Sequence, residues 1–182
     1  MITQNIVYYW TSTLFGAAGF IVQNVVVGWV TYELTGSALL TSITLGVWFL
    51  PMLLLAPIGG FLADSLDRKH LAIGSCVGSV VITFTFIGVF QSGIQSFPSL
   101  FVYNMVSGLP YALATPSRVA LVADLVLNKN LIKAFAYNES LANISSLIAA
   151  GLTGFLLLHI QISSILFLSG TVHIFAALAL IP

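Results

Sequence analysis

The chain has 182 residues, of which 59% are hydrophobic and 5% charged, and its five Lys and Arg balance five Asp and Glu. A mean hydropathy of +1.08 excludes a soluble domain, and the lack of a basic surface argues against a nucleic-acid partner. Helices are expected rather than a barrel, because the alternating pattern of barrel strands is absent. The single cysteine, Cys76, excludes an internal disulfide and is expected to be a small buried side chain.

The apolar stretches predict six membrane-spanning helices, at about 20 residues per crossing. Turn-forming residues separate them at 35–37, 91–93 and 115–117, and Pro116 is expected to end the fourth span because proline interrupts a helix. In chain order the expected spans are Val7–Tyr32, Ala38–Ala63, Leu71–Phe90, Pro98–Thr115, Ala134–His159 and Ile162–Ile181.

The basic residues orient these spans. All five lie in the second and fourth connections, namely Arg68, Lys69, Arg118, Lys129 and Lys133. The positive-inside rule therefore places this side, and with it both termini, in the cytoplasm. A cleavable signal peptide is not expected, because residues 1–9 carry no basic stretch.

The fourth connection is expected to contain a short helix at the lipid surface. Apolar residues recur there at helical spacing from Val119 to Val126, while charged residues can face water. Because both are expected on the cytoplasmic side, a charge contact between Arg118 and the segment around Asp64 is a further hypothesis.

Three segments resemble one transporter family. The pattern Gly60-x-x-x-Asp64-x-x-x-Arg68-Lys69 is similar to the loop between the second and third helices of the major facilitator superfamily. Residues 23–37 look like the first helix and first outer turn of its drug and siderophore exporter branch, and residues 116–126 look like the inner loop after the fourth helix of that branch. That branch includes enterobactin exporters and macrolide efflux proteins. The resemblance runs from about residue 19 to 154, within the superfamily's N-terminal six-helix half.

The resemblance implies an all-α integral membrane fold that is half of a twelve-helix transporter. Residues 1–182 are expected to form one six-helix domain of two three-helix inverted repeats, about 1–92 and about 93–182. The implied function is secondary active export of drug-like or siderophore-like small molecules by alternating access, in a plasma or bacterial inner membrane. The chain would pair with a second six-helix half or another copy of itself. The alternative is a truncated or split protein that acts only as a scaffold or pairing partner.

A gating role is implied for the charged loop. In the family, the acid equivalent to Asp64 helps to latch the two halves together, and Arg68 and Lys69 would steady that latch. Gly59 and Gly60 would let two helices approach closely. The alternative is that Arg68 and Lys69 only set the topology, and that Asp64 and Asp67 only neutralise them.

Polar residues inside the spans are candidates for a substrate cavity, because such groups are costly in lipid unless they face a cavity or another helix. These candidates are Gln23, Asn24, Tyr103, Asn104 and Asn143. The alternative for each is a hydrogen bond between helices. Glu139 is the deepest acid and the candidate for proton coupling.

Neither an enzyme nor a cofactor or metal site is expected. His70, His159 and His173 fall at an inner end, an outer end and the middle of a span, so they indicate no shared site. No phosphate-binding glycine-rich motif is present.

Overall fold

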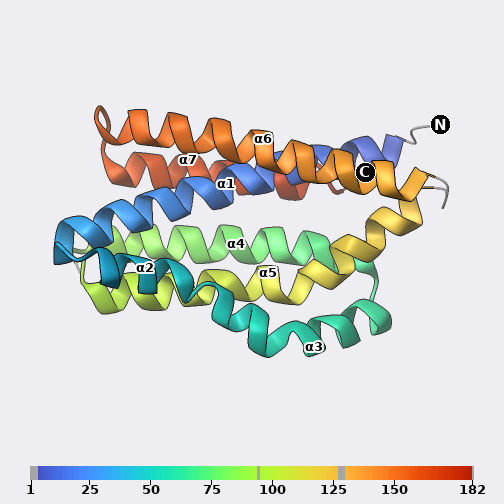
Figure 1. The fold of residues 1–182 in the computed structure, drawn as a ribbon, viewed down its shortest axis with the longest axis horizontal. Coiled ribbons are helices and arrows are strands. Elements are labelled where there is room, and N and C mark those ends of the chain that lie inside the picture. The colour runs from blue at the N-terminus through green and yellow to red at the C-terminus, as the bar shows by residue number, and fades with distance from the viewer. Residues whose placement is uncertain (1–3, 94, 127–129, 182) are drawn as a thin grey trace.

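The computed structural model describes residues 4–93, 95–126 and 130–181, which form a bundle of helices with no strand among them (Figure 1). This confirms the all-helical expectation. The helices are α1 (Gln4–Thr35), α2 (Ala38–Gly46), α3 (Phe49–Ser65), α4 (Arg68–Gln91), α5 (Phe97–Leu125), α6 (Leu131–Leu157) and α7 (Ile162–Leu178).

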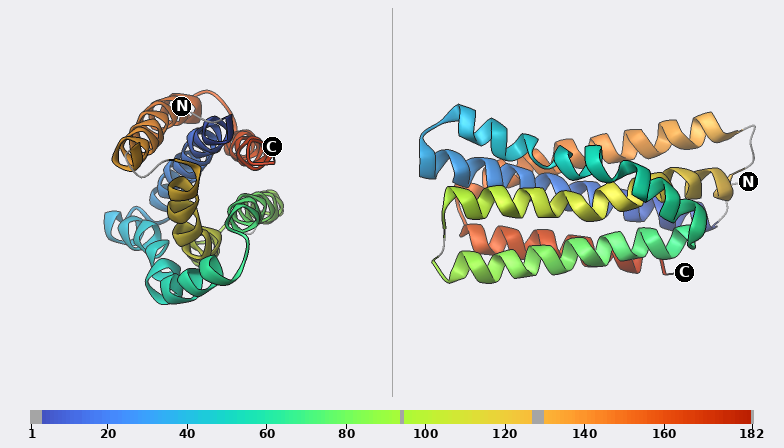
Figure 2. Two further views of the ribbon diagram at one scale, coloured as in Figure 1. Left: turned by 90° about the vertical axis from the view of Figure 1, so that its right-hand side faces the viewer. Right: turned by 90° about the horizontal axis from the view of Figure 1, so that it is seen from below.

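Several of these helices can cross a membrane. Within the described residues, four stretches are long and apolar enough to do so: α1, α2 with α3, α4 and α6. Helix α7 is apolar but has 17 residues, and the 29-residue α5 runs alongside the others (Figure 2). Length, composition and arrangement therefore support an integral membrane protein.

The second expected span is bent. Helix α2 ends at Gly46 and α3 begins at Phe49, so the chain changes direction around Trp48 (Figure 1). Pro51 has no N–H to donate to the carbonyl four residues earlier, which interrupts the helical ladder at this point. The bend buries the indole of Trp48, which is 5% exposed.

Helix α5 is longer than expected, because it continues through Pro116 instead of ending there. The proline leaves the carbonyl of Ala112, four residues earlier, without its usual helical donor. Helix α3 passes closely at this point, where a Cβ on Gly59 would lie 2.8 Å from the Ala112 oxygen. Prolines are tolerated in membrane helices, where neighbouring groups compensate for the lost backbone hydrogen bond. The predicted separate surface helix is therefore wrong, and Arg118 belongs to α5 itself.

Glycines set two of the closest helix contacts. A side chain on Gly59 would meet the α5 backbone, and one on Gly108 of α5 would overlap the carbonyl of Trp48. Close approach was expected at Gly59 and Gly60 together, but a Cβ on Gly60 would have nothing within 4 Å among the described residues. Only the first of the two glycines is needed for packing within this part of the chain.

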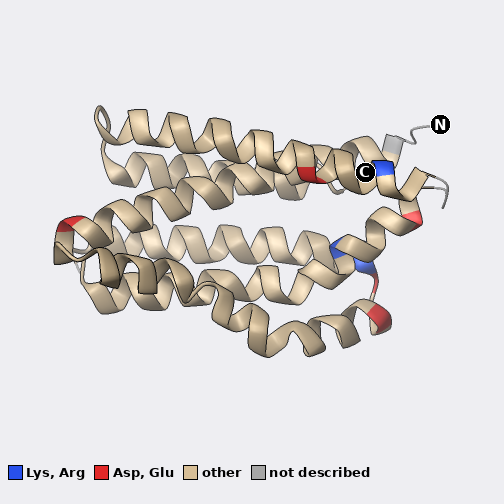
Figure 3. Ribbon diagram, in the orientation of Figure 1, with Lys and Arg blue, Asp and Glu red and all other residues tan. Residues whose placement is uncertain are grey.

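The basic side chains gather at one end of the bundle. Figure 3 shows the described Lys and Arg at the end where both termini lie. Lys129 lies outside the described residues. This shared end is what the positive-inside argument required of the sequence.

Candidate functional site

A cavity of about 320 Å³ lies between the helices. Its lining comes from α1, α4, α5, α6 and α7, together with Trp48 at the bend between α2 and α3. Both halves of the sequence therefore contribute to it. We call this space the central cavity.

One wall of the central cavity is aromatic. The rings of Phe20 and Trp48 lie 4.6 Å apart between centroids, those of Trp48 and Tyr111 4.9 Å, and those of Phe20 and Tyr111 6.4 Å. The three residues come from α1, the bend and α5, so helix packing holds them together. Such a cluster offers a large apolar surface with a polar tyrosine edge.

A cation, Arg118, also lines the cavity. Its Nη2 lies 2.9 Å from Sγ of Cys76 on α4, and its backbone carbonyl accepts a hydrogen bond of 3.2 Å from the hydroxyl of Tyr9. No carboxylate of the described residues forms an ion pair with Arg118. Sequence reasoning missed this residue because Pro116 was interpreted as the end of the helix.

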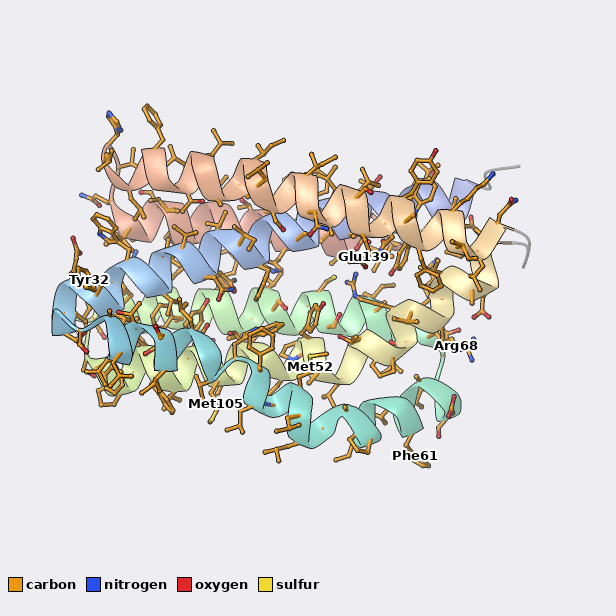
Figure 4. All side chains as sticks on the ribbon, in the orientation of Figure 1. Tyr32, Met52, Phe61, Arg68, Met105 and Glu139 are labelled. Carbon is orange, nitrogen blue, oxygen red and sulfur yellow. The ribbon has the colours of Figure 1, made fainter. Side chains whose placement is uncertain are left out.

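Glu139 brings an acid to the same cavity from α6 (Figure 4). Its Oε1 accepts a hydrogen bond of 3.3 Å from the amide of Asn138, whose Oδ1 in turn accepts one of 2.9 Å from the Thr13 hydroxyl. The carboxyl is exposed rather than buried. Glu139 and Arg118 thus face one space without forming a direct pair.

Two of the predicted cavity residues line it. Gln23 is 6% exposed and donates from its amide to the hydroxyl of Thr83 on α4. Asn143 lies on α6 and is exposed. His173 of α7 is a further lining residue, with its Nδ1 2.9 Å from the carbonyl of Ser169.

The other three predicted residues lie outside the cavity lining. Asn24 donates to the carbonyl of Phe20 in its own helix at 2.9 Å. Tyr103 is buried and stacks on Phe86 with centroids 3.8 Å apart. Asn104 is 1% exposed, and its amide donates at 2.6 Å to the carbonyl of Thr44, which joins α5 to α2. Of the three, Asn104 forms the hydrogen bond between helices that was the alternative, whereas the bond of Asn24 stays within α1 and the contact of Tyr103 is a ring stack.

The charged loop divides into anchored bases and a free acid. Nη1 of Arg68 lies 2.9 and 2.7 Å from the two carboxylate oxygens of Asp124, at the end of α5 (Figure 4). Nζ of Lys69 donates to the carbonyl of Ile181 at 2.8 Å. Asp64 is exposed and forms no hydrogen bond or ion pair within the described residues. The hypothesised contact between Arg118 and the Asp64 segment is wrong, because Arg118 points into the bundle.

Asp67 caps the next helix. Its Oδ1 accepts a hydrogen bond of 2.8 Å from the backbone N–H of His70, in the first turn of α4. That backbone hydrogen bond is the main cause of a lowered pKa for the Asp67 carboxyl. Asp67 therefore has a local structural role that Asp64 lacks.

Comparison with known proteins identifies the family. Residues 9–182 match the family model described as Major Facilitator Superfamily. Quinolone resistance protein NorA of Staphylococcus aureus is 26% identical over 123 residues, which cover 68% of this chain and 30% of NorA. Macrolide efflux protein A of Streptococcus pyogenes is 28% identical over 141 residues, which cover 75% of this chain and 33% of that protein. The chain thus matches only about a third of the length of these curated relatives.

Proposed function

The chain belongs to the major facilitator superfamily, and we propose that it forms the N-terminal six-helix half of a secondary active transporter that exports drug-like or siderophore-like molecules. The family is one of membrane transporters and not of enzymes. The names of the two relatives point to export of small antimicrobial compounds. The observation that carries the proposal is the central cavity, which helices from both ends of the chain enclose.

The proposed repeats are about 1–92, with α1, α2–α3 and α4, and about 93–182, with α5, α6 and α7. Helix α1 packs on α6 and α7, while α5 packs on α3 and α4. Each repeat therefore packs against the other, which supports one domain over residues 1–182. Alternating access would rock this domain against a second one around the cavity.

A second six-helix half, or another copy of this chain, is the proposed partner. Within the described residues, Asp64 is exposed and forms no hydrogen bond or ion pair, and a Cβ on Gly60, Gly151 or Gly154 would meet nothing within 4 Å. Small residues at open positions allow another helix to approach closely. Asp64 and Gly60 would therefore engage the opposing half, while Arg68 and Lys69 hold the loop to this one.

Of the five polar residues expected to face a substrate, Gln23 and Asn143 line the cavity and are the proposed substrate contacts. Tyr103 and Asn104 would instead hold together the helices that shape the cavity, and Asn24 would act only within α1. Glu139 is the proposed proton-coupling residue, because it is the acid that lines the cavity among the described residues. The end of the bundle that carries the basic residues, with both termini, would lie on the cytoplasmic side of the plasma or bacterial inner membrane.

Accumulation of norfloxacin and erythromycin, in bacterial cells that lack their own exporters, tests the proposal. Expression of the protein should lower the accumulation of at least one compound. Asp64→Asn should reduce this export, while Asp67→Asn should preserve it because asparagine also caps a helix. Equal export by both variants would contradict the gating role. Unchanged accumulation despite correct membrane insertion would favour the scaffold alternative.

A further inference from the structure

We propose that the central cavity binds an amphipathic carboxylate, with Arg118 holding its anionic group and the aromatic wall of Phe20, Trp48 and Tyr111 holding its apolar part. This inference rests on the proposed function, because it names the chemical class of the exported molecule.

The first argument is the unmet charge of Arg118. A guanidinium stays protonated at any relevant pH and has five N–H donors. The structure gives this side chain one hydrogen bond within the described residues, to the thiol of Cys76, and a thiol is a weak acceptor. Arg118 is half-buried and lines the cavity, so its remaining N–H groups can donate to an anionic ligand there. A carboxylate can satisfy the guanidinium with two parallel hydrogen bonds.

The second argument is that Glu139 does not cancel this charge. It is the one acid that lines the cavity among the described residues, and no ion pair joins it to Arg118. Arg118 therefore offers the cavity a cation without an ion-pair partner among the described residues, while the carboxylate of Glu139 opposes the binding of an anion.

The third argument is the spacing of the two ends. Tyr111 and Arg118 are seven residues apart on α5, which is about two turns and about 10 Å along the axis. Both line the cavity, so they face the same space. A volume of about 320 Å³ falls at the lower end of the range for small-molecule sites. The ligand that fits has one or two fused rings and a carboxylate on a short linker.

Binding of 1-naphthaleneacetate and 1-naphthaleneacetamide tests this inference, because the two differ in charge but hardly in size. Equilibrium dialysis would use the protein in nanodiscs of zwitterionic lipid at neutral pH. The acid should bind about ten-fold or more tightly than the amide, as expected for a hydrogen-bonded charge pair. Glu139→Gln should tighten binding of the acid, since it removes a like charge.

Arg118→Gln should abolish the preference for the acid, and Arg118→Lys should keep part of it. The matched control is Lys133→Gln, which removes an exposed cation outside the cavity lining and should leave the preference unchanged. Equal affinity of the wild-type protein for acid and amide would overturn the proposal without reliance on any variant. A higher affinity for 1-naphthylmethylamine than for the amide would also overturn it, because the cavity would then select cations.

Cys76 reports the place of binding. It is the single cysteine of the 182 residues, lines the cavity and contacts Arg118. Its alkylation by N-ethylmaleimide, followed by mass spectrometry, should be slower with the acid than with the amide. An acid preference without export of any compound would refute the proposed function alone. Export without an acid preference would refute this inference alone.

Discussion

The crossing of α3 and α5 can be tested with a single methyl group at Gly59. In Gly59→Ala, the new Cβ would lie 2.8 Å from the oxygen of Ala112, 3.1 Å from that of Leu113 and 3.3 Å from the Leu113 Cα. All three are backbone atoms, so the two helices must separate to relieve the overlap. Overpacking of this kind costs about 1–3 kcal/mol, while alanine returns up to about 1 kcal/mol through its higher helix propensity.

Gly60→Ala is the matched control, because it gains the same propensity in the same helix but meets nothing within 4 Å among the described residues. The propensity contribution cancels between the two variants, so Gly59→Ala should be less stable by about 1–3 kcal/mol. At about 2–4 °C per kcal/mol for a chain of this size, the midpoints should differ by several degrees. Thermal unfolding followed by tryptophan fluorescence measures this difference. Equal midpoints would refute the close approach of α3 to the carbonyl freed by Pro116.

Three further predictions concern hydrogen bonds and charges. The side chains of Arg68 and Asp124 are 35% and 52% exposed, so solvent should weaken their ion pair. A double-mutant cycle should give a coupling energy of at most about 1 kcal/mol, and a larger value would contradict this screening. The pKa of the Asp67 carboxyl is lowered in the folded state. The carboxylate should therefore stabilise the fold above the ordinary pKa of 3.8, and this stabilisation should be lost as the pH falls through the lowered pKa. Unfolding midpoints from about pH 5 to pH 3 should therefore fall less in Asp67→Asn than in the parent, and parallel curves would contradict this cause. Asn104→Ala should destabilise the protein by about 1–3 kcal/mol, because it leaves the buried carbonyl of Thr44 without this donor. Asn24→Ala should cost less, because its hydrogen bond lies within one helix. Unfolding midpoints compare the two variants, and the reverse order would contradict the contact between α5 and α2.

Much of the helical arrangement could be predicted from the sequence, and the main departure occurs at Pro116. A proline is a reliable break in an isolated helix, because it removes a donor and crowds the preceding turn. Here the neighbouring helix α3, through Gly59, closes on the freed carbonyl, and α5 continues. Local sequence rules cannot include a partner that is more than 50 residues away in the chain.

Contacts between distant helices also decide which of the candidate residues line the cavity. Gln23 and Asn143 could be recognised as polar residues within spans, and both line the cavity. Arg118 could not, because its position follows from the continuation of α5. Asn104 is likewise a polar residue within a span, but its amide donates to the carbonyl of Thr44 on α2.

The sequence alone determined that this is an all-helical membrane protein, where most of its spans lie, which end carries its basic residues and to which family it belongs. These properties follow from sums over neighbouring residues, since hydropathy, charge and motif spacing do not depend on distant contacts. Only the tertiary structure decided that α5 continues through Pro116, that Arg118 lines the central cavity, and that Asp64 forms no hydrogen bond or ion pair within the described residues. Those outcomes depend on how each helix is rotated and how closely its neighbours approach, which is set by packing across the whole bundle.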